Sequence, residues 1–457
     1  MDYSRPLSPN NTITLGLAMY RPAKPKGVLF INTGGSDPVA VAAWQFALGQ
    51  TTEFSGLTDY DLMMMDVRGT YSSNQLNVSL EVFGGYPLEY PQSEAEFEVF
   101  RQASAEVFQS WIGSSSPPGI IQFVGTKEVV RDYEEIRKAL GYDKVHFLGE
   151  SYGSFRAQRY ALAFPKRVGH FALDAVVPYG RNLYDEAQDH VNSVNRGMLR
   201  ADAYCQAEPS CPFRDQGAGS VLKVFQKILA NLKQAAEACT DPTDCPDLLP
   251  VPAVQQAMLS SLQGQPDFST IIKALESAVQ GDFSALLGDQ GAPTVEGVVA
   301  LPLECGDIPY NTYTYSDFKR ALEVGLTRDV TGIGMTPTWQ LQLYCSGYPF
   351  SVSGPPNLPI SNNMLLVTAD FDVDAPTEWT TFAWGNARNS ALVVRHGDGH
   401  VSFLHESQTS TSITKEFLRT GRLPTPRHDT NVSVYSPGMH RPPVSNPYKV
   451  PILAPLE

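Results

Sequence analysis

The sequence predicts an α/β fold whose doubly wound, mostly parallel sheet is interrupted by a mainly helical insertion. Short apolar runs flanked by Gly or polar turns alternate with amphipathic stretches in two blocks, one near each end of the chain. Between the blocks the strand pattern disappears and helix-compatible segments alternate with turns rich in Pro, Gly and Cys. We therefore expect a first sheet part at 1–179, a helical cap at 180–345, a second sheet part at 346–424 and a Pro-rich tail at 425–457.

The apolar runs have the length of buried parallel strands. In the first block they cover residues 27–32, 60–67, 145–148 and 170–177, and in the second block 364–368 and 391–395. The segment 126–140 places Val129, Tyr133, Leu140 and their apolar neighbours on one helical face, which predicts a helix packed on the sheet. In the cap we expect helices at 221–238 and 268–287, and we expect the tail to be extended or partly disordered.

Composition and charge exclude several classes of partner. The 457 residues are 42% hydrophobic and 18% charged, as in an ordinary globular protein, and the net charge is −14. Nucleic acids and anionic membrane surfaces select basic patches, so we expect neither as a partner. The apolar runs are also far too short to span a bilayer.

The six cysteines and three N-x-S/T sequons favour an oxidising compartment. Short spacings within two cysteine pairs are typical of disulfide loops, and a zinc site is disfavoured because there is no C-x-x-C and no histidine near the four clustered cysteines. Our preferred pairing is Cys205–Cys211, Cys239–Cys245 and Cys305–Cys345. The sequons at Asn10, Asn77 and Asn431 suggest a secreted glycoprotein, whereas the opening residues lack a signal-peptide pattern. Either the natural start lies upstream or the protein stays inside the cell.

Ser151 is the candidate nucleophile. It lies in Gly-Glu-Ser-Tyr-Gly at 149–153, directly after an apolar run and directly before a helix-compatible run. A sharp turn between a strand and a helix exposes a serine hydroxyl at the carboxyl edge of a sheet, and its flanking glycines leave room for the tight backbone. An ordinary strand-to-helix turn is the alternative interpretation.

A serine nucleophile needs a histidine base and a carboxylate that orients the base. His400 lies in a Gly-rich turn after 391–395 and is favoured over His396, which ends that run and is expected to be structural. Asp370, Asp372 and Asp374 all follow the run 364–368, and spacing alone does not choose among them. Backbone N–H groups of Tyr152 and Gly35 are the expected oxyanion donors.

Together these residues resemble the tripeptidyl-aminopeptidase-like and prolyl-iminopeptidase-like serine hydrolases of the α/β-hydrolase superfamily. The similar segments are Asp2-Tyr3-Ser4-x-Pro6, the Gly34-Gly35 loop, Asp66-x-Arg68-Gly69-Thr70-x-Ser72, the serine motif, Leu173-Asp174, the segment from Leu365 through Asp372 to Pro376, Gly399-His400 and Gly421-x-Leu423-Pro424. The resemblance implies that Asp372 is the acid and His400 the base. It also implies a cap with cysteines like Cys305 and Cys345, and cleavage near the amino terminus of a peptide.

Two departures from the family pattern keep other substrates open. Gly34-Gly35 is followed by Ser36-Asp37-Pro38 rather than by Pro-Gly, and Tyr71 stands where the family has a second glycine. Our first hypothesis is an aminopeptidase-like serine hydrolase acting on peptides through an acyl-enzyme, with no cofactor or metal. The alternatives are an esterase, thioesterase or lactone hydrolase of small-molecule metabolism, or a non-catalytic binding protein of the same fold.

Overall fold

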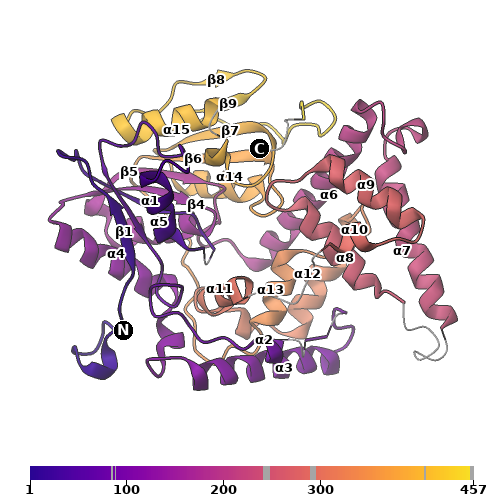
Figure 1. Cartoon of the computed structure of the whole chain (residues 1–457), viewed down its shortest axis with the longest axis horizontal. Coiled ribbons are helices and arrows are strands. Elements are labelled where there is room, and N and C mark those ends of the chain that lie inside the picture. Colours follow the sequence, from indigo (N-terminus) through magenta and orange to yellow (C-terminus); the bar gives the residue numbers. More distant parts are fainter. Residues whose placement is uncertain are drawn as a thin grey trace.

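A single twisted sheet organises the chain (Figure 1). The computed structural model describes residues 1–35, 37–83, 86–87, 89–239, 248–288, 295–405 and 408–452. Within these residues nine strands form one sheet in the order β1-β3-β2-β4-β5-β6-β7-β9-β8. Their bounds are β1 Leu17–Tyr20, β2 Val28–Asn32, β3 Asp61–Met65, β4 Val145–Glu150, β5 Val168–Asp174, β6 Met364–Phe371, β7 Ala391–Asp398, β8 Arg427–His428 and β9 Val432–Tyr435.

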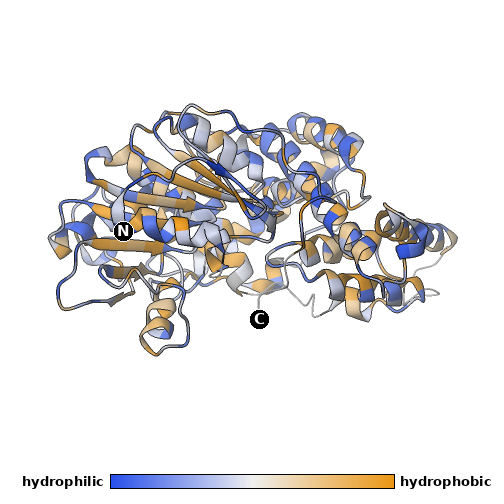
Figure 2. Ribbon diagram, turned by 90° about the horizontal axis from the view of Figure 1, so that it is seen from above, coloured by the Kyte–Doolittle hydropathy of each residue, from blue (hydrophilic) through white to orange (hydrophobic). Residues whose placement is uncertain are grey.

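The six central strands, from β3 to β7, run parallel, and antiparallel strands close both edges. Every residue of β2, β3 and β6 is buried, as expected for parallel strands covered on both faces. Figure 2 shows these strands as an apolar layer between helices of mixed hydropathy. All six strands predicted from apolar runs are therefore present, with ends that differ by a few residues.

Helices cover both faces of the sheet. One face packs against α4 (Thr126–Leu140), α5 (Tyr152–Ala163) and α14 (Thr377–Asn386) through residues such as Phe30, Tyr133 and Phe147. The other face packs against α1 (Val39–Ala47) and α15 (Thr409–Thr420) through residues such as Ile31 and Phe417. The sheet is doubly wound, as predicted. The short α2 (Leu80–Phe83) and the long α3 (Glu94–Ser114) complete this part, and neither was predicted.

A helical region separates β5 from β6. It contains α6 Leu183–Ala207, α7 Ser220–Ala238, α8 Val251–Leu262, α9 Phe268–Val279, α10 Ser284–Leu287, α11 Val295–Cys305, α12 Tyr315–Arg328 and α13 Pro337–Tyr344. Helices α6 to α10 pack around their own apolar cluster, at the right of Figure 1. The helix expected at 268–287 is two helices, because Gly281 has φ +90° and Asp282 accepts a hydrogen bond from the Ser284 backbone N–H.

The described part of the tail joins the sheet. Its strand β9 pairs antiparallel with β7, and β8 pairs with β9. Beyond β9, Arg200 of α6 donates hydrogen bonds to the carbonyl groups of Pro447, Val450 and Pro451. The tail is thus extended, as predicted, but it also supplies two edge strands that its Pro-rich composition concealed. The exact domain limits stay a prediction.

Two of the predicted disulfides are present. Cys205–Cys211 closes a short loop at the end of α6, and Cys305–Cys345 ties the end of α11 to the end of α13. The third predicted pair includes Cys245, which lies outside the described residues.

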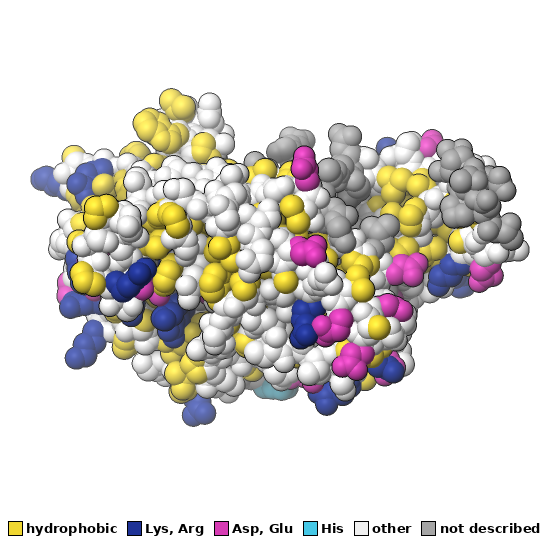
Figure 3. All heavy atoms as spheres, turned by 90° about the horizontal axis from the view of Figure 1, so that it is seen from below, with side chains coloured by type: hydrophobic (Ala, Val, Ile, Leu, Met, Phe, Trp, Pro, Cys, Tyr) yellow, Lys and Arg dark blue, Asp and Glu magenta, His cyan; other side chains and the backbone are white. Residues whose placement is uncertain are grey.

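The surface carries its charges unevenly. On the face drawn in Figure 3, basic side chains lie mostly over the sheet and acidic ones mostly over the helical region. In the part of the chain that the structure describes, no helix combines the length and apolar character needed to cross a membrane.

Candidate active site

Ser151 occupies a strained turn between β4 and α5. Its backbone has φ 51° and ψ −127°, a conformation that costs of the order of 1–3 kcal/mol and that tertiary contacts must hold in place. The Ser151 N–H donates to the Asp174 carbonyl (3.0 Å), and the Ser151 carbonyl accepts from Ser154 N–H (2.9 Å). A Cβ atom at Gly153 would lie 2.1 Å from the Asn32 carbonyl oxygen, so this turn requires glycine there. The predicted strand, sharp turn and helix are all present.

Gly34 lies against the turn. A Cβ atom at Gly34, which has φ +98°, would be 2.7 Å from the Ser151 Cβ and 2.8 Å from the Tyr152 backbone nitrogen. The loop after β2 therefore approaches the candidate nucleophile where the oxyanion loop was predicted. Gly35, the residue we had chosen from the sequence, has φ +43°, and its carbonyl accepts a hydrogen bond from Arg156 (2.9 Å).

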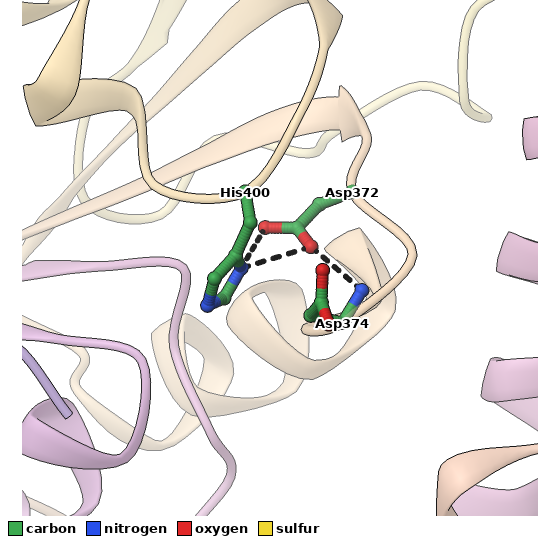
Figure 4. A group of neighbouring side chains, drawn as sticks. All are labelled: Asp372, Asp374 and His400. Atoms are coloured by element: carbon green, nitrogen blue, oxygen red, sulfur yellow. Dashed lines mark hydrogen bonds and ion pairs between the residues drawn. The ribbon is translucent and has the colours of Figure 1, made fainter. Parts of the chain in front are cut away.

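Asp372 and His400, the residues predicted as acid and base, lie within hydrogen-bonding distance of each other (Figure 4). The Nδ1 atom of His400 is 3.0 and 2.9 Å from the two carboxylate oxygens of Asp372. Asp372 is fully buried, and its Oδ1 also accepts the backbone N–H groups of Asp374 (2.9 Å) and Ala375 (2.8 Å). These bonds fix the carboxylate independently of the histidine. Ser151, Asp372 and His400 follow β4, β6 and β7, so all three lie at the carboxyl edge of the parallel strands.

Several carboxylates surround His400. Burial alone would lower its pKa, but the nearby carboxylates of Asp372, Asp374 and Asp174 outweigh burial and raise the pKa of His400 from 6.5 to about 9. The pKa of Asp174 itself is raised to about 6, chiefly by burial. A base in this environment reaches its neutral form only under alkaline conditions, unless a ligand changes the local charge.

The other histidine considered for the base has a different partner. His396 lies 2.6 Å from Asp370 through Nδ1 and 2.8 Å from Ser433 through Nε2. It therefore ties β6, β7 and β9 together. The structure separates two Asp–His pairs that the spacing of the sequence left open.

Arg156 is a site residue that the sequence analysis missed. Its guanidinium donates to the Asn32 side chain (2.7 Å) and to the Gly35 carbonyl (2.9 Å), and it stacks 5.1 Å from the centre of the Tyr152 ring. Arg156 thus fixes the Gly34-Gly35 loop from the helix that follows the nucleophile. An arginine one turn into an ordinary helix gives no sequence signal of this role.

Acidic side chains of the helical region reach the same helix. The Tyr152 hydroxyl donates to Asp307 (2.9 Å), and burial raises the pKa of Asp307 to about 6 and that of Glu304 to about 7. Glu304 and Asp307 both act on the Tyr152 phenol, which places Glu304 close to the residue after Ser151. Glu276, another glutamate of the helical region, is exposed on α9.

Two segments near the amino-terminal end that carry the family resemblance contact each other. The buried Arg68 pairs with Asp132 (2.7 Å), and the Tyr3 hydroxyl donates to the same carboxylate (2.7 Å). Tyr71, which replaces a family glycine, adopts a positive φ of 35°. The two segments that carried the family resemblance therefore contact a common ion pair, and the Tyr71 substitution keeps the backbone that glycine would favour.

Comparison with known proteins agrees with this geometry. The family described as "alpha/beta hydrolase fold" matches residues 28–221, and the family "TAP-like protein" matches residues 330–431. These matches contain the serine turn and the Asp372–His400 pair, respectively. The two matches support an α/β-hydrolase fold whose second sheet part is similar to TAP-like proteins.

Curated relatives that match part of this chain include proteins named as peptidases. It is 27% identical over 238 residues to the serine protease Hip1 of Mycobacterium tuberculosis, covering 50% of this chain and 44% of that protein. It is 28% identical over 166 residues to the tripeptidyl aminopeptidase of Streptomyces coelicolor, covering 34% of this chain and 29% of that protein. The chain thus spans less than half the length of these relatives.

Solved structures add only a distant similarity. A proline iminopeptidase of Mycobacterium smegmatis aligns over 90% of this chain and 96% of its own, with 12% identity and a TM-score of 0.42. At these values the similarity carries no argument about substrate.

Proposed function

We propose that this protein is a serine hydrolase that acts through an acyl-enzyme, with Ser151, His400 and Asp372 as its triad. The observation that carries the proposal is the buried Asp372–His400 pair at the same sheet edge as the strained Ser151 turn. An ordinary strand-to-helix turn would need neither the strain nor a histidine held by a buried carboxylate.

In the proposed reaction the Ser151 hydroxyl attacks a carbonyl carbon, and His400 Nε2 takes the hydroxyl proton. Asp372 accepts the Nδ1–H of His400 and stabilises the imidazolium that forms. The oxyanion receives hydrogen bonds from the Tyr152 N–H and from the Gly35 N–H in the loop fixed by Arg156. His400 then protonates the leaving group, and water releases the acyl group from Ser151 by the reverse sequence.

We propose that the substrate is a peptide cleaved near its amino terminus. The serine protease and tripeptidyl aminopeptidase names of the relatives support this class. Glu304 is our candidate for holding the substrate ammonium, because its half-buried carboxyl acts electrostatically on Tyr152, the residue after Ser151, and desolvation raises its pKa to about 7. Removing a carboxylate from water is costly, and a bound cation offsets that cost.

Fluorophosphonate labelling tests the nucleophile. Peptide mapping of the labelled protein should place the adduct on Ser151, and Ser151→Ala should lose that adduct while melting at a similar temperature. Absence of an adduct on Ser151 in the folded, unmodified protein at alkaline pH would instead favour a non-catalytic binding protein.

A substrate panel tests the peptidase assignment. Aminoacyl and tripeptidyl naphthylamides should be hydrolysed, and Glu304→Gln should raise KM for them by about 10-fold or more while leaving p-nitrophenyl acetate turnover unchanged. Glu276→Gln is the matched control, since Glu276 is an exposed glutamate of the same region. Equal effects of the two variants would remove Glu304 from the ammonium site.

A small-molecule ester is the second candidate substrate, and Asp37 is the observation that favours it. Asp37 follows the Gly34-Gly35 loop; the residue is exposed, desolvation nonetheless raises the pKa of its carboxyl, and it interacts electrostatically with His400. A carboxylate at this place repels the negative charge of a developing oxyanion. Hydrolysis of an amide depends on oxyanion stabilisation more than hydrolysis of an activated ester does, so this repulsion favours an ester substrate. Brisk p-nitrophenyl ester turnover without any naphthylamide release would establish this alternative.

We also propose that the protein enters a secretory pathway. Cys205–Cys211 and Cys305–Cys345 support an oxidising compartment, and the three sequon asparagines are all exposed. Removal of N-linked glycans from protein isolated from its native source should change its mass, and an unchanged mass would leave the sequons unused.

A further inference from the structure

The turn between α8 and α9, residues 263–265, contacts the loop that carries His400. The His400 N–H donates to the Gly264 carbonyl (2.7 Å), and the Gln265 side-chain amide donates to the His400 carbonyl. A Cβ atom at Gly399 would lie 2.2 Å from the Gln265 side-chain oxygen. The turn therefore binds both the N–H and the carbonyl of His400, and it lies so close to Gly399 that a side chain there would clash.

The same turn also contacts the loop that carries Asp372. Asp374, two residues after Asp372, accepts hydrogen bonds from the Gly264 N–H (2.7 Å) and from the Gln263 side chain (2.8 Å). Figure 4 shows Asp374 beside the Asp372–His400 pair. Gly264 thus donates to the acid loop and accepts from the base loop, so this single residue of the helical region bridges both.

In the part of the chain that the structure describes, the hydrogen bonds that the Asp374 carboxylate accepts come from this turn. Asp374 is not the residue that pairs with His400 Nδ1, and its carboxylate acts on His400 through its charge. The residue is half-buried, and desolvation raises the pKa of its carboxyl. A carboxylate held by donors from one turn of the helical region fixes that turn rather than the sheet.

We propose that Asp374 and the α8–α9 turn form a latch through which docking of the helical region holds His400 in its catalytic position. The latch rests on the proposed triad. It makes Asp374 and Gln265 positioning residues, and it makes the base competent only while the α8–α9 hairpin is docked on the sheet edge.

Besides Asp374, several ionisable groups contribute to the charge around Asp372 and His400, and residues 263–265 of the α8–α9 turn contribute none. These groups are Asp37 after β2, Asp174 at the end of β5, His190 of α6 and Arg395 of β7. A variant that neutralises only Asp374 leaves all the others in place. It therefore isolates the electrostatic part of the latch.

The test measures the rate constant for fluorophosphonate labelling of Ser151 against pH. Asp374→Asn keeps the size and an acceptor oxygen, so the protein should fold, and the acid limb of the profile should move down by about one pH unit. Asp215→Asn is the matched control because Asp215 is exposed in η4 (Arg214–Gln216), and its limb should not move. A purely structural role for Asp374 would lower the rate at every pH without moving the limb.

The geometric part is tested by Gln265→Ala, Asp374→Ala and the double variant. Each single change should lower kcat for an aryl ester on the order of 10- to 100-fold with little change in KM. The double variant should be no worse than the more damaged single one, because one release frees the whole turn.

The possible failures are distinguishable. If the unmodified protein gains no adduct on Ser151, the triad is wrong. If Ser151 is labelled but the Asp374→Asn limb coincides with that of the unmodified protein, or the losses multiply in the double variant, the latch is wrong and the triad stands.

Discussion

Replacing Asp372 by Asn should disable the proposed base while leaving the fold intact. The side chain is fully buried and receives three N–H groups, those of His400 Nδ1, Asp374 and Ala375. An asparagine oxygen can still accept the two backbone N–H groups, but its amide then presents donors to Nδ1. His400 must then accept at Nδ1 and carry its proton on Nε2, the tautomer that cannot accept the serine proton.

The expected loss is about 10³- to 10⁴-fold in the labelling rate of Ser151, or about 4–5.5 kcal/mol of transition-state stabilisation. Asp370→Asn is a matched control on the same strand, since Asp370 is equally buried and binds His396 instead (2.6 Å). It should change the rate less than about 10-fold. The reasoning is refuted if both variants melt normally and Asp370→Asn is the more damaged of the two.

Further predictions concern pH, the oxyanion loop and the Cys305–Cys345 disulfide. Because His400 must be neutral to act, kcat/KM should rise with pH until about 9 and then level, and a limb near 6.5 would contradict the carboxylate effect. The raised pKa also means that the charged imidazolium stabilises the fold below pH 6.5, and that this contribution is lost as pH rises through about 9. Gly34→Ala places a Cβ 2.7 Å from that of Ser151, at a backbone φ of +98°. Labelling of Ser151 should therefore fall at least about 10-fold, and the free energy of unfolding should fall by about 1–3 kcal/mol. The control Gly385→Ala in α14, which has open space around it, should be neutral or stabilising. Removing Cys305–Cys345, with its sequence separation of 40, should lower the free energy of unfolding by about 4 kcal/mol in urea titration, and an unchanged midpoint would show that the bridge does not constrain the unfolded chain.

Much of the fold was predictable because its signals are local. Apolar runs of strand length located all six parallel strands, and the amphipathic pattern at 126–140 located α4. The edge strands were not predictable in the same way. Strands β1 and β9 are four residues each, and β8 is two, so their partners rather than their own pattern define them.

The candidate active site was likewise predictable only in part. The order of Ser151, Asp372 and His400, together with the family resemblance, was enough to nominate the triad. Sequence could not show that Arg156 fixes the Gly34-Gly35 loop or that Glu304 lies beside Tyr152. Those contacts join segments that are far apart along the chain and have no periodicity in common.

What the sequence determined by itself is the strand, turn and helix around Ser151, because glycine spacing and apolar runs act on neighbouring residues. The family resemblance pointed to Asp372 and His400, but the spacing of the residues did not show which aspartate contacts which histidine. Asp370 and Asp372 are two residues apart and so point to the same side of an extended strand, and His396 and His400 lie four residues apart. Only the tertiary structure shows the contacts: the pairing of β6 with β7, which shifts register between Ala369 and Phe371, and the α8–α9 turn against His400 place Asp370 against His396 and Asp372 against His400. Long-range packing fixes these contacts, because they join residues that are far apart along the chain.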